Sequence, residues 1–168
     1  IYFDSLNSNI YNYDNSNIFN EYLNTLGISG YPLLDYSIIK NTGYSNTTGN
    51  FNTFIGDSVG YSNKFGSQNT LLGYNSGHNL LSGDKNILIG SNTGYNLKKT
   101  TQNIFIGDNC GYNNLDNNNI FIGNNSAQNS QIGNSNIYLG NNSGKNSIRT
   151  NLNILIGDTT GKHIGNKL

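Results

Sequence analysis

Three aspartates occupy the same position of a repeated sequence motif and are the first candidates for acid–base chemistry. Asp57, Asp108 and Asp158 each follow the glycine that closes a largely apolar triplet. Two carboxylates work as an acid–base pair when about 5–10 Å separates them. These aspartates lie three repeats apart, so stacked repeats would hold neighbours roughly 14 Å from one another. We therefore expect them to solvate turns, and the sequence predicts no catalytic residue.

Histidine, cysteine and glycine suggest no metal or cofactor either. His78 and His163 have neither a cysteine nor a carboxylate at ligand spacing, so no metal site is predicted. Cys110, the single cysteine, falls at a repeat position otherwise held by small or β-branched residues, and we expect it to be a buried filler. The glycines recur too regularly to cradle one phosphate, and no GxxxxGK[ST] sequence occurs, so no cofactor is predicted.

Four tyrosines at one repeat position form the most promising candidate for a binding surface. Each follows a second small residue, Gly or in one repeat Ala, which stands four residues after the position of the closing glycine, in motifs such as GYSN and GYNL. His78 holds the same position. Rings stacked one repeat apart beside Asn and Ser would present an aromatic and amide surface suited to sugar rings. The alternative is that each ring only packs over the edge of its own repeat. The candidate glycan- or receptor-facing residues are Tyr44, Tyr61, Tyr95 and Tyr112.

An internal repeat defines all of these positions. An Asn, a triplet such as Ile-Phe-Ile and a closing Gly recur with a period of 17, apart from one step of 16 between Gly107 and Gly123. The residue missing from that step falls in a polar stretch far from the triplet, where a loop should tolerate it. A degenerate first coil is expected at 27–43. The chain thus divides into a non-repetitive segment, 1–26 (a linker, a cap or the end of a preceding domain), and a repeat domain, 27–168.

The apolar triplet of each repeat predicts a short strand that ends at a turn. The period is too short for two helices, and the many Gly, Asn and Ser residues within it disfavour helix. The segment after the second small residue predicts a weaker second strand. Neither Asn-Gly nor Asp-Gly occurs, which favours parallel stacking over hairpins. The predicted fold is all-β, a parallel β-roll or solenoid of about 7–8 coils.

Both faces of the predicted strand are apolar, which indicates burial on both sides. So short a coil can cover one face with its own second strand but has little left for the other. A bare stripe of aromatics and leucines would be a large exposed patch, so we predict a side-by-side homotrimer with that stripe against partner chains. Which face forms the roll interior stays open. The trimer-interface or core stripe comprises Phe54, Leu71, Leu88, Phe105, Phe121, Tyr138 and Leu155.

The phrase N-[TI]-x-[IL]-G-x-x-x-G, with polar residues between its copies as in GYSNTTGNFNTFIGDSVGYSN, resembles the head repeats of trimeric autotransporter adhesins, the YadA-like heads. It is also similar to repeats in phage and giant-virus fibre proteins. The resemblance covers roughly residues 36–162. It implies a left-handed parallel β-roll, three of which associate into a rigid fibre head that attaches to host surfaces. The present repeat is longer than that of the bacterial heads and has a single alanine, Ala127.

The composition and charge of the chain limit the kinds of partner it could bind. The net charge is zero, 11% of the residues are charged and no Lys/Arg-rich stretch occurs, which argues against nucleic acid or an anionic membrane as a partner. No apolar run approaches the ~18–20 residues of a membrane span, so no membrane insertion is expected within this segment. The Asn- and Ile-rich composition favours a virion over a bacterial source.

Our hypothesis is a non-enzymatic, structural and adhesive segment of a trimeric surface fibre that mediates host attachment. It would lie on the surface of a virion or, alternatively, a cell, and bind a host receptor or glycan. A polysaccharide-processing β-solenoid enzyme is one rival and would need clustered carboxylates or a groove. A monomeric ice- or ligand-binding solenoid is another and would need an outward Thr-x-Thr column, whereas Thr gives way to Ile from the third coil onward.

Overall fold

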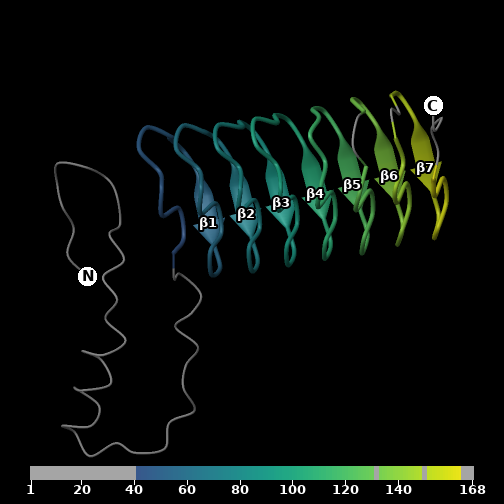
Figure 1. The fold of residues 1–168 in the computed structure, drawn as a ribbon, viewed down its shortest axis with the longest axis horizontal. Coiled ribbons are helices and arrows are strands. Elements are labelled where there is room, and N and C mark those ends of the chain that lie inside the picture. The colour runs from purple at the N-terminus through teal and green to yellow at the C-terminus, as the bar shows by residue number, and fades with distance from the viewer. Residues whose placement is uncertain (1–40, 131–132, 149–150, 164–168) are drawn as a thin grey trace, which may run out of the picture.

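The computed structural model describes residues 41–130, 133–148 and 151–163, which form a solenoid with a single parallel sheet (Figure 1). Seven three-residue strands pair in sequence order. They are β1 (Thr53–Ile55), β2 (Thr70–Leu72), β3 (Ile87–Ile89), β4 (Ile104–Ile106), β5 (Ile120–Ile122), β6 (Ile137–Leu139) and β7 (Ile154–Ile156). The predicted parallel β-solenoid, with one coil for each sequence repeat, is confirmed. Segment 1–26 lies outside the described residues, as does the expected first coil at 27–43 up to residue 40.

The pairing register equals the sequence repeat. Thr53 pairs with Thr70, and the same shift of one full period continues to β4. Across the shortened step Ile104 still pairs with Ile120, so the missing residue leaves the sheet intact. The turns absorb it, as predicted: Asn103 Nδ2 donates to the carbonyl of Asp116, 13 residues away, where other coils span 14.

The middle residue of each triplet points into the solenoid. Leu71, Leu88, Phe105, Phe121 and Tyr138 are fully buried, and the terminal Phe54 and Leu155 pack against them. The three aromatic rings stack, with centroids 4.7 Å and 4.9 Å apart. This column is therefore the roll core. Of the two roles predicted for this column, trimer interface or core, the structure shows the core, because the chain itself encloses these side chains.

A second buried column closes the core from the opposite side of each coil, nine residues after the first. Leu88 lies in the same coil as Leu97, whereas Phe121 shares its coil with Ser130. Each aromatic residue of the first column thus faces a small or polar residue, and each leucine faces a leucine, so the larger side chains are offset by smaller ones across the core. The coil pairs are Phe54 with Asn63, Leu71 with Leu80, Leu88 with Leu97, Phe105 with Asn114, Phe121 with Ser130 and Tyr138 with Ser147.

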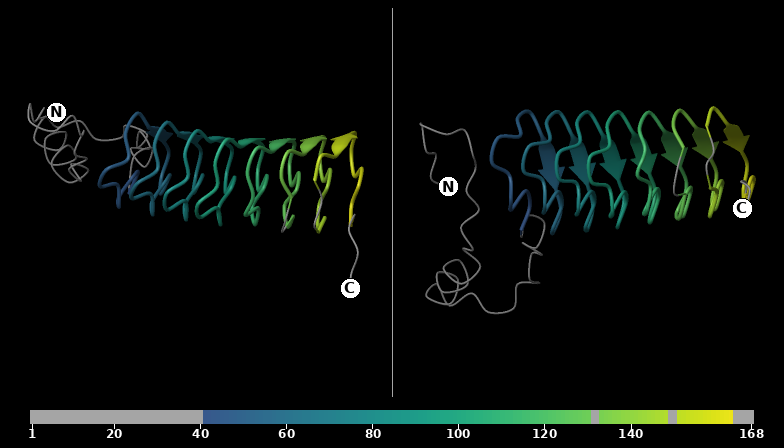
Figure 2. Two further views of the ribbon diagram at one scale, coloured as in Figure 1. Left: turned by 90° about the horizontal axis from the view of Figure 1, so that it is seen from above. Right: turned by 45° about the horizontal axis from the view of Figure 1, so that its top comes forward.

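The predicted second strand of each coil is wrong. In the described residues every strand comes from the triplet, and the later segment is a series of turns. In the coil of β1, for example, residues 61–65 form turns and bends, and the side chain of Asn63 bonds both the carbonyl and the N–H of Gly66, at 3.0 Å and 3.1 Å. The turns nevertheless stack through backbone hydrogen bonds, such as Asn79 N–H to the carbonyl of Tyr95 at 3.0 Å. Figure 2 shows the strands along one side of the solenoid and the turns along the other.

Left-handed backbone positions explain part of the Asn content. The second residue after the closing Gly has φ between 52° and 58° in every described coil. Asn enters this region at lower cost than most residues. It holds the position in coils such as those of Asn75, Asn92 and Asn109. The closing glycines are required more strictly: Gly90 has φ of 135°, and a Cβ there would lie 2.6 Å from the carbonyl oxygen of Gly107.

The Asn that precedes each triplet forms a buried ladder along the solenoid. The Oδ1 of Asn69 accepts both the backbone N–H and the Nδ2 of Asn86, each at 3.0 Å. The same Nδ2 donates to the carbonyl of Thr100 at 2.8 Å. Each buried amide thereby gains partners in its own and adjacent coils, as burial of a polar group requires. The described part of the chain contains no helix that could cross a membrane.

Candidate functional site: two exposed surfaces

The first surface is the outer sheet face, formed by the first and third residues of strands β1 to β7. Alternation along a strand directs these side chains away from the core. All are Ile or Leu except Thr53 and Thr70. Ile55, Leu72 and Ile87 are 45%, 40% and 38% exposed. Leu72 and Ile87 are exposed to this extent even though their strands, β2 and β3, have a neighbouring strand on each side. The face is therefore a continuous aliphatic surface.

The outer sheet face is long and uncharged. At a parallel-strand spacing of about 4.8 Å, the six steps between β1 and β7 make it roughly 29 Å long. Monomeric soluble proteins rarely leave so continuous an apolar surface open to water. Threonine appears only as the first residue of β1 and β2, each followed by an aliphatic third residue. The outward Thr-x-Thr column of an ice-binding surface does not form.

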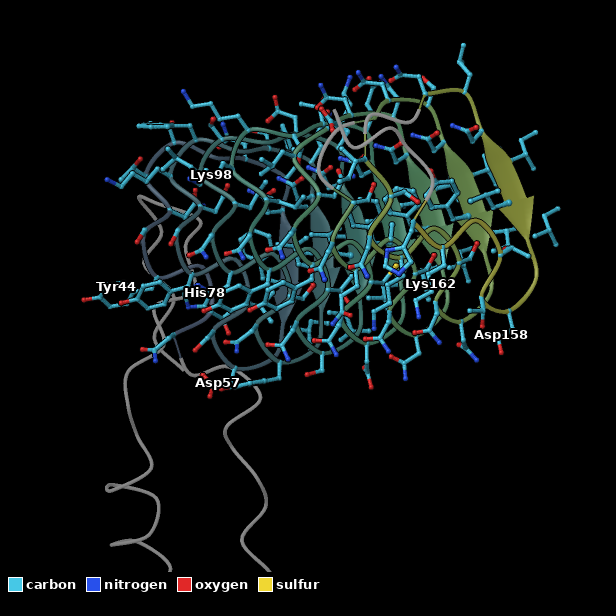
Figure 3. All side chains as sticks on the ribbon, turned by 45° about the vertical axis from the view of Figure 1, so that its right-hand side comes forward. Tyr44, Asp57, His78, Lys98, Asp158 and Lys162 are labelled. Carbon is cyan, nitrogen blue, oxygen red and sulfur yellow. The ribbon has the colours of Figure 1, made fainter. Side chains whose placement is uncertain are left out.

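The second surface is the aromatic–basic stripe, which follows the predicted tyrosine position along one flank of the turns. The rings of Tyr44, Tyr61, His78, Tyr95 and Tyr112 stack face to face, with centroids 4.9–5.1 Å apart and interplanar angles of 4–14°. Stacking covers the inner ring faces, so ring edges and hydroxyls meet solvent. The column continues with Gln128, Lys145 and Lys162. In Figure 3 Tyr44 points outward at one end of the solenoid, with His78 beside it and Lys162 towards the other end.

An amide ladder runs beside this stripe, on the residue that follows each ring. Asn79 Nδ2 donates to the Oδ1 of Asn96 at 2.9 Å, and Asn96 donates likewise to Asn113 at 2.7 Å. The series continues through Asn129 to Asn146. His78 Nδ1 lies 3.0 Å from Asn79 Oδ1, which joins the two columns. Each ladder bond uses one of the two N–H groups of an amide, so the half-buried ladder keeps further hydrogen-bonding capacity.

The basic end of the stripe was missed in the sequence. The predicted column stopped at Tyr112, the last aromatic residue, although the phrases GKN and GKH put lysine at the same distance from the second small residue. Backbone stacking confirms the equivalence: Gly144 N–H donates to the carbonyl of Thr160 at 2.8 Å, as Gly60 N–H does to that of Ser76 at 3.0 Å. The repeat spacing therefore marks the two lysines, but a column defined by its aromatic residues does not include them.

The three aspartates belong to turns. Asp108 Oδ1 accepts the backbone N–H of Ser91 at 3.1 Å, and Asp57 Oδ1 accepts the hydroxyl of Ser58 at 3.0 Å. Asp158 is exposed, and Figure 3 shows Asp57 and Asp158 at opposite ends of the solenoid. Among the described residues no cluster of three His, Cys, Asp or Glu side chains occurs.

Cys110 is buried, as predicted. Its Sγ lies 3.3 Å from the carbonyl oxygen of Phe121, and desolvation by burial raises the pKa of the thiol well above its usual range. A hydroxyl at the same repeat position bonds in the same way: Ser76 Oγ donates to the carbonyl of Leu88 at 3.0 Å. The thiol thus occupies a structural position. No protein-family model, curated protein or solved structure matches the chain.

Proposed function

We propose that this chain is a structural and adhesive segment of a trimeric surface fibre, on a virion or a cell surface, that mediates host attachment. The observation that carries the proposal is the exposed outer sheet face. Covering that face removes aliphatic side chains from water, which is the main favourable term in protein association.

Copies of the same chain are the occupants that this face fits best. An identical solenoid repeats with the same strand spacing, so its Ile and Leu side chains meet those of the first chain in register along the whole length. The outer sheet face carries no charged residue, so parallel copies bring no like charges together. Parallel alignment also places Thr53 and Thr70 beside their own equivalents. Three copies, rather than two, follow from the resemblance to trimeric fibre heads.

The adhesive role follows from repetition. Each coil presents the same turns at a fixed spacing, and three parallel chains present them three times. Weak contacts to a host receptor or glycan then add to a high overall affinity, because every contact after the first is effectively intramolecular. Stacked coils and buried Asn ladders give such a fibre its stiffness without a globular core.

A charge placed on the outer sheet face tests the proposal. Ile122 lies on that face and is 39% exposed, whereas Leu115 is 54% exposed and lies outside the sheet. We expect Ile122→Lys to dissociate the trimer, because three ammonium groups would be buried together without partners. Leu115→Lys adds the same charge elsewhere and should leave the assembly intact. Sedimentation velocity on both variants decides: equal sedimentation of the two as trimers would contradict the proposed interface.

A further inference from the structure

We propose that the aromatic–basic stripe binds a linear acidic polysaccharide that lies along the solenoid axis. This names the ligand class for the adhesive role, and so it rests on the proposed function. Three properties of the stripe carry the inference: its free cations, the absence of carboxylates along it, and the spacing of its hydrogen-bonding groups.

The cations gather at one end of the stripe. Lys162 is exposed and Lys145 half-buried, and neither forms an ion pair with another described residue. His163 follows Lys162 directly and is also exposed. The chain as a whole has no net charge, so an anion is attracted only where positive side chains gather, as they do at this end of the stripe. A carboxylated or sulfated polymer would find unpaired ammonium groups here.

Carboxylates are absent from the stripe and from the column beside it. Between Tyr44 and His163, the ring position and the position after it hold only Tyr, His, Gln, Lys, Ser and Asn. The described aspartates lie at other positions of the repeat: Asp57, Asp84, Asp108, Asp116 and Asp158. An anionic chain along the stripe therefore meets no carboxylate in these two columns, while the two lysines attract one end of it.

The spacing of the stripe suits an extended polymer more than a compact ligand. Ring centroids recur every 4.9–5.1 Å, and the adjacent amides recur with the same coils. An extended β-1,4-linked glycan advances by a similar distance with each sugar, so successive sugars would meet successive coils. Tyrosine hydroxyls and ladder amides both donate and accept hydrogen bonds, which matches the hydroxyls of sugars. Because the inner ring faces are covered, contact is through ring edges rather than sugar–ring stacking.

Two polymers that differ only in charge provide the test. Polymannuronate and β-1,4-mannan share their linkage, but only the first carries carboxylates. We expect the full 168-residue chain to bind polymannuronate in calorimetry at low ionic strength and to bind mannan far more weakly. Added salt should weaken the binding, because exposed charges are screened. Equal binding of the two polymers, or none of polymannuronate, overturns the proposal.

Matched lysine variants locate the site. Lys145→Gln with Lys162→Gln replaces both cations by the residue that Gln128 already places in the column. The control, Lys98→Gln with Lys99→Gln, removes the same charge from a turn away from the stripe, where Figure 3 shows Lys98 on the upper edge. We expect the first pair to weaken polymannuronate binding roughly tenfold and the control by less than about twofold. Equal weakening by both pairs would mean non-specific attraction and overturn the site.

Sedimentation of the same samples separates this proposal from the fibre proposal. A trimer that does not bind polymannuronate overturns the ligand class alone. A monomer that binds it, with the expected lysine dependence, overturns the fibre and supports the stripe as a binding site.

Discussion

The inner and outer faces of the sheet are built from the same triplets and differ in how their residues vary. The inner column changes between Leu, Phe and Tyr from coil to coil, and each change is matched across the core, as in Leu88 with Leu97 and Phe121 with Ser130. The outer columns are almost uniformly Ile or Leu. An interior needs only constant volume within one coil, so its residues vary in compensated pairs. The uniform exposed columns fit the proposal that this surface meets copies of itself.

Truncation on each face gives the largest expected contrast. Leu88 is fully buried, whereas its neighbour Ile89 lies on the outer sheet face. We expect Leu88→Ala to lower the free energy of unfolding by about 2–5 kcal/mol, because it leaves a cavity. Ile89→Ala should leave the fold intact and weaken association instead. Urea unfolding and sedimentation of both variants check this, and a reversal of the two effects would contradict the assignment of the faces.

Paired changes of two core residues within one coil should have an intermediate effect on the free energy of unfolding. Leu88→Phe alone should cost about 1–3 kcal/mol, because the core is already filled by Leu97. Adding Leu97→Ser recreates the combination of Phe121 and Ser130, and we expect a favourable coupling of about 0.5–3 kcal/mol between the two changes. A double-mutant cycle measured by urea unfolding supplies the number. Simple additivity would show that the paired volumes are coincidental.

A backbone change in the terminal coil should have the smallest effect. Thr159 is exposed and has φ of 58°, which is costly for a β-branched residue. Other coils place Asn there, as at Asn142. Thr159→Asn should therefore raise the free energy of unfolding by about 0.5–1 kcal/mol without touching either face. Asn142→Thr is the reverse test and should lower it by a similar amount; a gain from both changes would exclude this explanation.

The sequence repeat predicted the sheet because spacing alone sets the pairing register, as between Phe54 and Leu71. It could not assign the faces, because both sides of the triplet are apolar and hydrophobicity does not distinguish a core from an interface. The second strand failed for a local reason: the chain turns within this segment, as where Asn63 bonds the carbonyl and the N–H of Gly66, and Asn is too frequent in this sequence to mark that turn. The repeat position of the tyrosines could be predicted from their shared residue type. Its continuation at Lys145 and Lys162 could be recognised only by comparing repeat positions, because the residue type changes there.

Sedimentation equilibrium of the unmodified chain tests most directly whether the outer sheet face is buried between copies. The chain has a mass of 18.4 kDa, and we expect the measured mass of the assembly to be near three times that value. A single species at 18.4 kDa would contradict this account, because the aliphatic face of the solenoid would then be stable while open to water.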